Sequence, residues 1–302
     1  MIKYLKRSEI DIEKYNNCVE KSFNSRVFAF SWYLDIVADN WDVLVLNDYE
    51  AVMPLPWREK YFIKYVYCPF WVIELGIYSF KNNVELDSFL QKVFENFKYS
   101  NLRMNADNVF NKFSENRHKK QLQYIDLEKG YNNIFKAYSR NRKRDLKKAN
   151  DFNLVAEWNT RNSDLVNLFK NNVGVRVKDV KDKDYNRLLK LLNECVARNV
   201  GELLSIFDEN GNLIASSFFL KHKNKVTELV CSTDFKNRNN GANTFFNDEA
   251  IKKYSKEFKI FNFGGSSMKN ISNYYKSFGA ETENYCELNY NNLPKLIKYF
   301  KK

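Results

Sequence analysis

The spacing of apolar residues in the first half of the chain predicts helices separated by a group of short strands. Apolar positions recur at the helical period in residues 12–24, 30–39 and 84–96. Short apolar runs bounded by turn residues predict strands at 41–46, 51–57, 61–67, 102–106 and 121–126. Asn47-Asp48 separates the first two of these strands and indicates an antiparallel hairpin.

The second half shows the same kinds of pattern in the same order. Helical spacing predicts helices at 164–172, 184–198, 241–256, 269–278 and 293–302. Strand-like runs occupy 152–158, 202–207, 213–220, 226–233, 258–263 and 282–288. Asn210-Gly211 is a strong hairpin signal, and Ser163 is placed to cap the helix that follows it.

A strongly basic segment, 131–150, lies between the two halves and is predicted to be one helix. Its cationic residues are Arg140, Arg142, Lys143, Arg144, Lys147 and Lys148. We therefore predict an α/β (α+β) protein with an N-terminal domain at 1–130, a basic connecting helix at 131–150 and a C-terminal domain at 151–302. The shared element order favours duplication of one unit.

The composition narrows the chemistry. The chain has 302 residues, enough for two domains, and 44% hydrophobic with 28% charged residues is a globular balance. Its five cysteines are scattered without a C-x-x-C pair, so we expect reduced thiols rather than disulfides or a zinc site. The two histidines, His118 and His222, are far apart and offer little to a metal site or a Ser-His-Asp triad. We expect no metal.

Charge and hydropathy suggest the location and the partners. No stretch approaches the roughly 20 apolar residues of a membrane span, and the N-terminus lacks the apolar run of a signal peptide. We expect a cytoplasmic protein without a transmembrane segment. The net charge of +12 suits a polyanionic partner such as a pyrophosphate, a nucleotide-linked sugar, an anionic membrane face or tRNA, or it serves solubility alone.

Residues 226–243 carry the first chemical signal: a strand, a polar basic loop and a helix start. Unpaired N–H groups and the positive end of the helix dipole bind phosphate at such a place. Gly241 lets the backbone approach a ligand closely, and Arg238 adds a fork of donors. The alternative is a plain helix start with an exposed arginine.

This loop resembles the acetyl-CoA loop of the GNAT acyltransferases, which reads Gln/Arg-x-x-Gly-x-Gly/Ala between a central strand and a helix. Arg238-Asn239-Asn240-Gly241-Ala242-Asn243 matches the first two fixed positions, and Asn243 departs from the third. The resemblance implies that these six residues bind the pyrophosphate of an acyl-CoA.

Residues 261–280 carry a second, more specific resemblance. A strand runs into Gly264-Gly265-Ser266, and a helix then leads to Tyr275-Lys276-Ser277-Phe278-Gly279-Ala280. This is similar to the end of the Fem-type transferases, and the basic segment 138–149 resembles the helix between the two halves of that group. The resemblance implies two tandem GNAT-like domains, each a mixed, largely antiparallel sheet flanked by helices. The long helical arm that some of the group carry has no room here, which weakens the expectation of a tRNA substrate.

The resemblance also implies roles for three residues. Glu228, on the strand before the loop, would be the general base, and Tyr275 would protonate the leaving thiolate. Lys276 would face a substrate phosphate or the oxyanion. The structural alternatives are an exposed strand glutamate, a core aromatic and an ordinary surface lysine.

Substrate contacts are expected at two further places. Gly264, Gly265 and Ser266 would form a turn that admits substrate to the strand ends, or are simply a tight connection. Arg140 and Arg144 would bind an anion, or belong to a solvated face.

We therefore expect an N-acyltransferase that moves an acyl group from acyl-CoA to an amine acceptor, which family analogy makes an amino sugar or a cell-envelope precursor, small or nucleotide-linked. One alternative keeps the fold and uses an aminoacyl-tRNA donor. The other is a non-catalytic module that binds an anion or nucleic acid. The oligomeric state cannot be read from the sequence.

Overall fold

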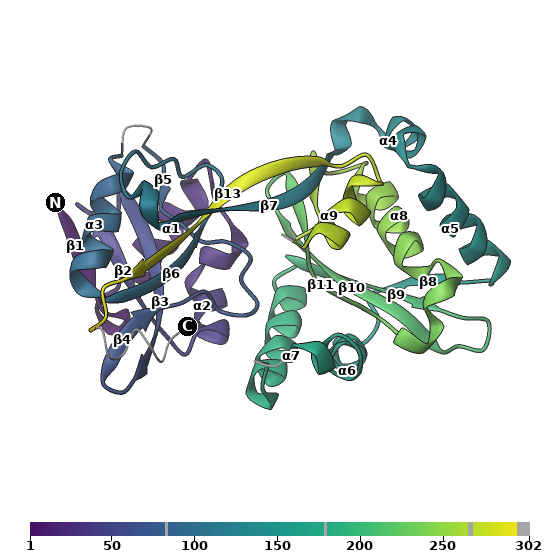
Figure 1. The fold of residues 1–302 in the computed structure, drawn as a ribbon, viewed down its shortest axis with the longest axis horizontal. Coiled ribbons are helices and arrows are strands. Elements are labelled where there is room, and N and C mark those ends of the chain that lie inside the picture. The colour runs from purple at the N-terminus through teal and green to yellow at the C-terminus, as the bar shows by residue number, and fades with distance from the viewer. Residues whose placement is uncertain (82–83, 178–179, 265–267, 295–302) are drawn as a thin grey trace. The chain divides into compact units, whose positions relative to one another are not determined.

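The chain forms two compact units. The computed structural model describes residues 1–81, 84–177, 180–264 and 268–294, and for Arg238 the backbone alone. Unit 1 comprises Met1–Lys120 with Asn284–Lys302, and unit 2 comprises Gln121–Glu283 (Figure 1). The division differs from the predicted domains, because 131–150 belongs to unit 2 and the chain returns to unit 1 after Glu283.

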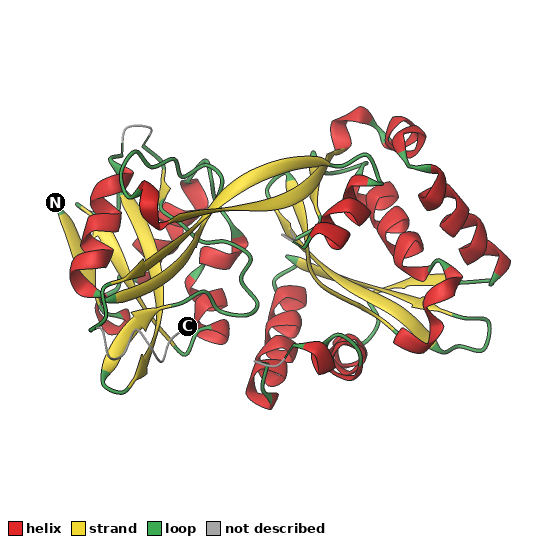
Figure 2. Ribbon diagram, in the orientation of Figure 1, coloured by secondary structure: helices red, strands yellow, loops and turns green. Residues whose placement is uncertain are grey.

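Unit 1 is a mixed sheet with helices on it (Figure 2). Its elements are β1 (Ile2–Leu5), α1 (Ile12–Lys21), α2 (Ser31–Val37), β2 (Asn40–Leu46), β3 (Ala51–Lys60), β4 (Ile63–Val66), β5 (Tyr78–Ser79), α3 (Leu86–Asn96), β6 (Tyr99–Met104) and most of β13 (Glu281–Asn291). The strand order is β1-β2-β3-β4-β6-β13, with β5 beside β3. Neighbours are antiparallel except β4 and β6, which are parallel.

Unit 2 has the same construction. Its elements are most of β7 (Arg117–Asp126), α4 (Tyr131–Ala137), α5 (Arg140–Asp151), β8 (Val155–Trp158), α6 (Asn162–Asn171), α7 (Asp182–Ala197), β9 (Gly201–Phe207), β10 (Leu213–His222), β11 (Lys225–Thr233), α8 (Ala242–Tyr254), β12 (Ile260–Asn262) and α9 (Lys269–Lys276). The strand order is β8-β9-β10-β11-β12-β7, and only β11 and β12 are parallel neighbours. Short 3-10 turns are η1 (Arg7–Glu9), η2 (Val27–Ala29), η3 (Ser114–Asn116), η4 (Leu127–Lys129), η5 (Gly174–Arg176) and η6 (Phe235–Asn240).

The two units repeat one order: strand, two helices, three antiparallel strands, helix, strand. The last strand of each sheet comes from elsewhere in the chain. β7, which follows unit 1's β6 in sequence, pairs with β12 of unit 2, and β13, which follows unit 2's α9, pairs with β6 of unit 1. The predicted mixed sheets flanked by helices are thereby confirmed, with an exchange of strands that the sequence patterns do not reveal.

Apolar side chains on both faces of each sheet explain these layers. In unit 2, α8 and α9 cover one face and α6 and α7 the other (Figure 1). Phe246 and Phe278 pack from the helices against Phe219 on the sheet. In unit 1, Phe89 and Val93 of α3 pack against residues of β2 and β3 in the same way. Among the described residues, no helix is long and apolar enough to cross a bilayer.

Three predicted features differ. The basic segment 131–150 is two helices, α4 and α5, because Tyr138 is extended and the Ser139 hydroxyl accepts a hydrogen bond from the Arg142 N–H at 3.4 Å, which begins a new helix. Ser163 does not cap α6, since it lies inside the helix after Arg161. The helix predicted at 12–24 ends at Lys21. Residues 295–302 of the helix predicted at 293–302 lie outside the described residues.

Candidate active site

The two parallel strands of unit 2 separate soon after they begin to pair. β11 and β12 are in register at Lys225–Ile260, Val226–Phe261 and Thr227–Asn262, and their register extends no further among the described residues. Immediately after this point β11 carries a bulge, because Phe218 of β10 lies opposite Val230 while Phe219 lies opposite Glu228. The extra residue, Leu229, bends the strand and turns the side chains beside it.

Glu228 lies at this bulge and is only 3% exposed. Its Oε1 accepts a hydrogen bond from the Ser217 hydroxyl at 2.7 Å. Burial raises the pKa of Glu228 to about 7, while Ser217, Cys231 and Tyr275 act in the opposite direction. Its Oε2 has no well-formed hydrogen bond to any described residue. The carboxyl can therefore change protonation near neutral pH and has one oxygen available for a further partner.

Tyr275 is fixed beside this carboxyl by the aromatic core of unit 2. Its ring stacks on Phe263, with centroids 4.5 Å apart, and it is 9% exposed. Burial, followed by the charge of Glu228, raises the pKa of Tyr275 well above its usual value. The same two causes raise the pKa of the Cys231 thiol. Both groups therefore hold their protons beside a carboxyl that can lose one.

Lys276 does not join this cluster. It follows buried Tyr275 on α9, and consecutive helical residues point about 100° apart, so its side chain is exposed. The structure thus brings together Glu228 and Tyr275, two of the three predicted catalytic residues. Ser217 and Cys231 were not predicted, because nothing in a β-strand pattern reveals which side chains a bulge will turn inward.

The predicted anion loop precedes α8 as expected, but parts of it are already occupied. The Ala242 N–H donates to Oδ1 of Asn240 at 3.1 Å, and the Phe235 N–H donates to Oδ1 of Asn172 at 2.7 Å. Asn239 and Asn243 are exposed. The side chain of Arg238 lies outside the described residues.

Gly241 has a packing role that the sequence did not suggest. Its φ is +83°, which favours glycine, and a Cβ there would stand 2.1 Å from the Asp145 carbonyl oxygen of α5. The glycine thus allows the backbone of α5 to approach the start of α8. This explanation replaces the predicted one, in which Gly241 admits a ligand on that side.

The other predicted substrate positions are only partly described. Gly264 has a φ of +75°, and its N–H donates to Oδ1 of Asn262 at 2.9 Å, which turns the chain after β12. Gly265 and Ser266 lie outside the described residues.

The basic helix α5 has one buried arginine and several exposed ones. Arg142 donates to the Thr244 hydroxyl at 2.9 Å, pairs with Asp145 at 2.9 Å and lies 4.5 Å from the centre of the Tyr274 ring. Arg142 therefore joins α5 to α8 and α9. Arg140 and Arg144 are exposed on the same helix, where an external anion can reach them.

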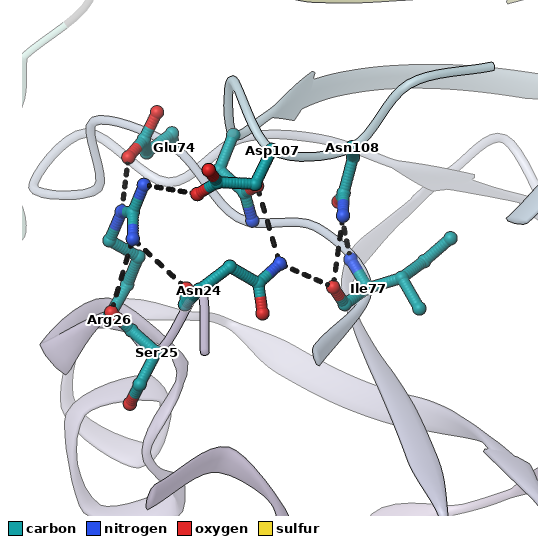
Figure 3. Close-up of polar contacts among 8 residues, drawn as sticks. Asn24, Ser25, Arg26, Glu74, Ile77, Asp107 and Asn108 are labelled. Carbon is teal, nitrogen blue, oxygen red and sulfur yellow. Dashed lines mark hydrogen bonds and ion pairs between the residues drawn. The ribbon is translucent and has the colours of Figure 1, made fainter. Parts of the chain in front are cut away.

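Unit 1 contains a second polar cluster, at the corresponding pair of parallel strands. Arg26 pairs with Glu74 at 2.5 Å and with Asp107 at 3.0 Å (Figure 3). Burial disfavours the charged guanidinium, but Glu74 outweighs this effect and raises the pKa of Arg26 above its usual value. These three residues are far apart in sequence and belong to no motif, so sequence analysis gave no signal for them.

This cluster lies where unit 1 closes the gap that unit 2 leaves between strands. Leu75, the residue after Glu74, donates to the Arg103 carbonyl and accepts from the Asn105 N–H, each at 2.8 Å. Asn108 holds the next turn through the Ile77 N–H at 2.7 Å (Figure 3). Backbone therefore fills the position beside β6 in unit 1.

Metal chemistry finds no support in these residues. Among the described residues, no group of three or more His, Cys, Asp or Glu side chains is arranged to hold a metal ion.

Comparison with known proteins places the fold. The sequence matches no known protein-family model and no curated protein. The structure of FemX is similar over 99% of both chains, with a TM-score of 0.62 at 10% identity. The C-terminal domain of an Agrobacterium fabrum protein described as a lysylphosphatidylglycerol synthetase is similar over 96% of this chain and 94% of that one, with a TM-score of 0.58 at 10% identity.

A tandem GNAT protein from the clavulanic acid biosynthesis pathway is also similar, over 98% of this chain and all of that one, 100%, with a TM-score of 0.57 at 8% identity. At these identities the likeness concerns architecture alone. The chain therefore has the tandem GNAT-like fold that FemX has.

Proposed function

We propose that unit 2 transfers an acyl group from an acyl-CoA donor, such as acetyl-CoA, to an amine acceptor. One observation carries the proposal: a 3% exposed Glu228, with a pKa near 7, at the point where the two parallel strands separate. A general base is most effective when its pKa lies near the working pH. The nearby Tyr275 counts against a purely structural role for this carboxyl.

In the proposed reaction the acceptor amine attacks the thioester carbonyl, forming the amide bond and breaking the C–S bond. Glu228 takes the proton of the amine, and Tyr275 gives its proton to the departing thiolate. Backbone N–H groups of β11 that point away from β10 stabilise the oxyanion. A proton then passes from Glu228 to Tyr275, since the two groups are in contact, and both return to their starting state.

The open edge of β11 supports binding of an extended donor. A chain that carries amide groups can add to an open strand edge through backbone hydrogen bonds. The donor's pyrophosphate would then reach the loop from Arg238 to Asn243, and Arg140 and Arg144 would bind acceptor phosphates. We keep an amino sugar or a cell-envelope precursor as the acceptor, by analogy of fold.

Two measurements test the proposal in sequence. The melting temperature is measured with acetyl-CoA, longer acyl-CoAs and CoA, because a ligand of the native state raises it. Thiol release is then measured with a panel of amines. We expect Glu228→Gln to keep the donor-induced shift and to lower kcat by about 10²–10⁴-fold. Retained activity in this variant, or no shift with any CoA at millimolar concentration, would overturn the proposal.

An aminoacyl-tRNA donor is the second candidate, and the region of Gly241 favours it. The backbone of α5 covers the glycine, and side-chain amides already cap two N–H groups of the loop. A polyanion on the exposed side of α5 would instead meet Arg140 and Arg144. In this case RNA should co-purify, and binding should fall steeply with salt. The double variant Arg140→Gln/Arg144→Gln should weaken RNA binding and leave any CoA-induced shift unchanged.

A further inference from the structure

The hairpin between β3 and β4 ends in two aromatic residues that the rest of unit 1 does not cover. Tyr61 is 79% exposed and Phe62 is 96% exposed. Large apolar side chains are seldom so exposed as a contiguous pair, and such a pair marks a surface that meets another apolar phase or partner.

The backbone of this turn is one that bulky residues rarely adopt. Lys60 pairs with Ile63, which leaves a two-residue loop, and φ is +52° at Tyr61 and +59° at Phe62. Two positive φ values in a two-residue hairpin loop are typical of a type I′ turn, where Asn-Gly is the favoured pair. The aromatic residues therefore stand here against the conformational preference of the turn, which points to a use outside the folding of the hairpin.

The hairpin tip also extends beyond the sheet. β2 reaches only as far as Trp57 of β3, and β4 meets β6 only at Val66, so Arg58–Lys60 and Ile63–Tyr65 pair only with each other among the described residues. Figure 1 shows this hairpin at the lower end of unit 1. A protruding tip can enter another phase without any rearrangement of the sheet.

Lysines flank the aromatic pair on both strands. The ammonium of Lys60 lies 5.3 Å from the centre of the Tyr61 ring, and that of Lys64 lies 4.2 Å from the Trp57 ring. The whole chain carries a net charge of +12. Aromatic residues at a tip with cations just behind them match a bilayer with anionic headgroups, where rings enter the interface and ammonium groups meet the lipid phosphates.

We propose that the Tyr61–Phe62 tip docks unit 1 reversibly on an anionic lipid bilayer. The aromatic rings enter the interfacial region, and Lys60 and Lys64 bind the headgroups. This inference is independent of the proposed transfer reaction, because no residue of the tip belongs to unit 2.

The turn chemistry gives a sharp experiment. Tyr61→Asn/Phe62→Gly removes both rings and installs the pair that the turn prefers, so the hairpin should remain folded with a melting temperature equal to or above that of the original protein. Co-sedimentation is measured with vesicles of phosphatidylglycerol and phosphatidylcholine, and with phosphatidylcholine alone. The original chain should bind the anionic vesicles more strongly, and added salt should weaken that binding.

We expect the double variant to lose about ten-fold or more in partition coefficient, since each aromatic ring contributes apolar burial. Lys60→Gln/Lys64→Gln should reduce binding to anionic vesicles alone. Phe152→Ser is the matched control, because Phe152 is a 53% exposed aromatic of unit 2 flanked by Asp151 and Asn153. No binding by the original chain, or binding undiminished in Tyr61→Asn/Phe62→Gly, would overturn the proposal.

Discussion

Units 1 and 2 share one strand order but treat the space between their two parallel strands in opposite ways. In unit 1, β4 pairs with β6 at Val66, and the backbone of Leu75 then continues beside β6. In unit 2, β11 and β12 pair through Thr227 and Asn262, and a bulge turns β11 at the point where they separate. One sheet is continued by its own chain, and the other is left with an open strand edge.

A buried carboxyl stands beside each of these places, in contrasting company. Glu74 in unit 1 is neutralised by Arg26, whereas Glu228 in unit 2 is met only by hydroxyl and thiol groups. A carboxyl paired with arginine stays ionised and structural, and one left without a cation can exchange a proton near neutral pH. Side chains, rather than topology, thus decide which copy of the unit can carry chemistry.

The largest effect that we expect comes from breaking the pair in unit 1. Arg26→Ala would leave Glu74, which is 3% exposed, as an uncompensated buried charge. We expect a loss of about 3–5 kcal/mol in the free energy of unfolding, measured by urea denaturation. Lys14→Ala is the control, since its pair with Asp48 is half exposed and should cost less than about 1 kcal/mol. A loss below that level for Arg26→Ala would show that the pair does not stabilise unit 1.

The carboxyl of unit 2 should show the opposite behaviour. The pKa of Glu228 is raised from 4.5 to about 7, so the protonated form fits the fold, and ionisation costs stability. This cost is absent below pH 4.5, grows as the pH rises, and is complete above pH 7, where 2.5 units correspond to roughly 3 kcal/mol. Glu228→Gln should therefore stabilise the protein at pH 8 and change little at pH 4.

Glu50→Gln provides a control of opposite sign, measured in the same urea series at both pH values. Lys81 and Asn47 lower the pKa of Glu50, so its ionised form favours folding, and the variant should lose stability at pH 8 relative to pH 4. A Glu228→Gln variant whose stability gain does not depend on pH would show that burial does not raise the pKa of this group.

A smaller effect should separate packing from backbone strain at the start of α8. Gly241→Ala introduces a methyl group at a φ of +83° and against the Asp145 carbonyl of α5. Gly211→Ala has a similar φ of +77° with nothing within 4 Å, so it measures the strain alone, about 1 kcal/mol. We expect Gly241→Ala to cost about 2 kcal/mol more, in the same urea assay. Equal costs would mean that α5 yields easily and that the glycine is not required for packing.

The sequence predicted most elements because their patterns are local. Strands such as β11 and helices such as α3 lie within a few residues of their predicted ranges, since alternation and helical spacing are properties of adjacent residues. The break at Tyr138 was missed because basic residues continue across it. The return of β13 to β6 was also missed, because pairing between residues about 180 apart leaves no local signal.

The candidate site divides in the same way. Glu228 and Tyr275 could be proposed from their positions in two family-like segments, and the structure brings them together. Ser217 and Cys231 could not, because the bulge at Leu229 decides which side chains face the carboxyl. Gly241 was visible as a glycine, but its neighbour Asp145 lies almost 100 residues away, so its packing role depends on tertiary structure.

The smallest effect that we expect would refine the account of Glu228 itself. Ser217 is the strongest of the groups that lower the pKa of this carboxyl, through a hydrogen bond of 2.7 Å. Ser217→Ala should raise the pKa of Glu228 further, by up to about one unit, since a hydrogen bond to a charged group is worth about 1.5 kcal/mol. An NMR titration of the labelled carboxyl carbon, assigned by its absence in Glu228→Gln, measures the shift. Ser216→Ala is the control, because the hydroxyl of Ser216 bonds to Ser205 and Leu204, away from the carboxyl. A titration midpoint that is the same in both serine variants would show that burial alone sets the proton affinity of the site, and that the polar neighbours in unit 2 do not tune it.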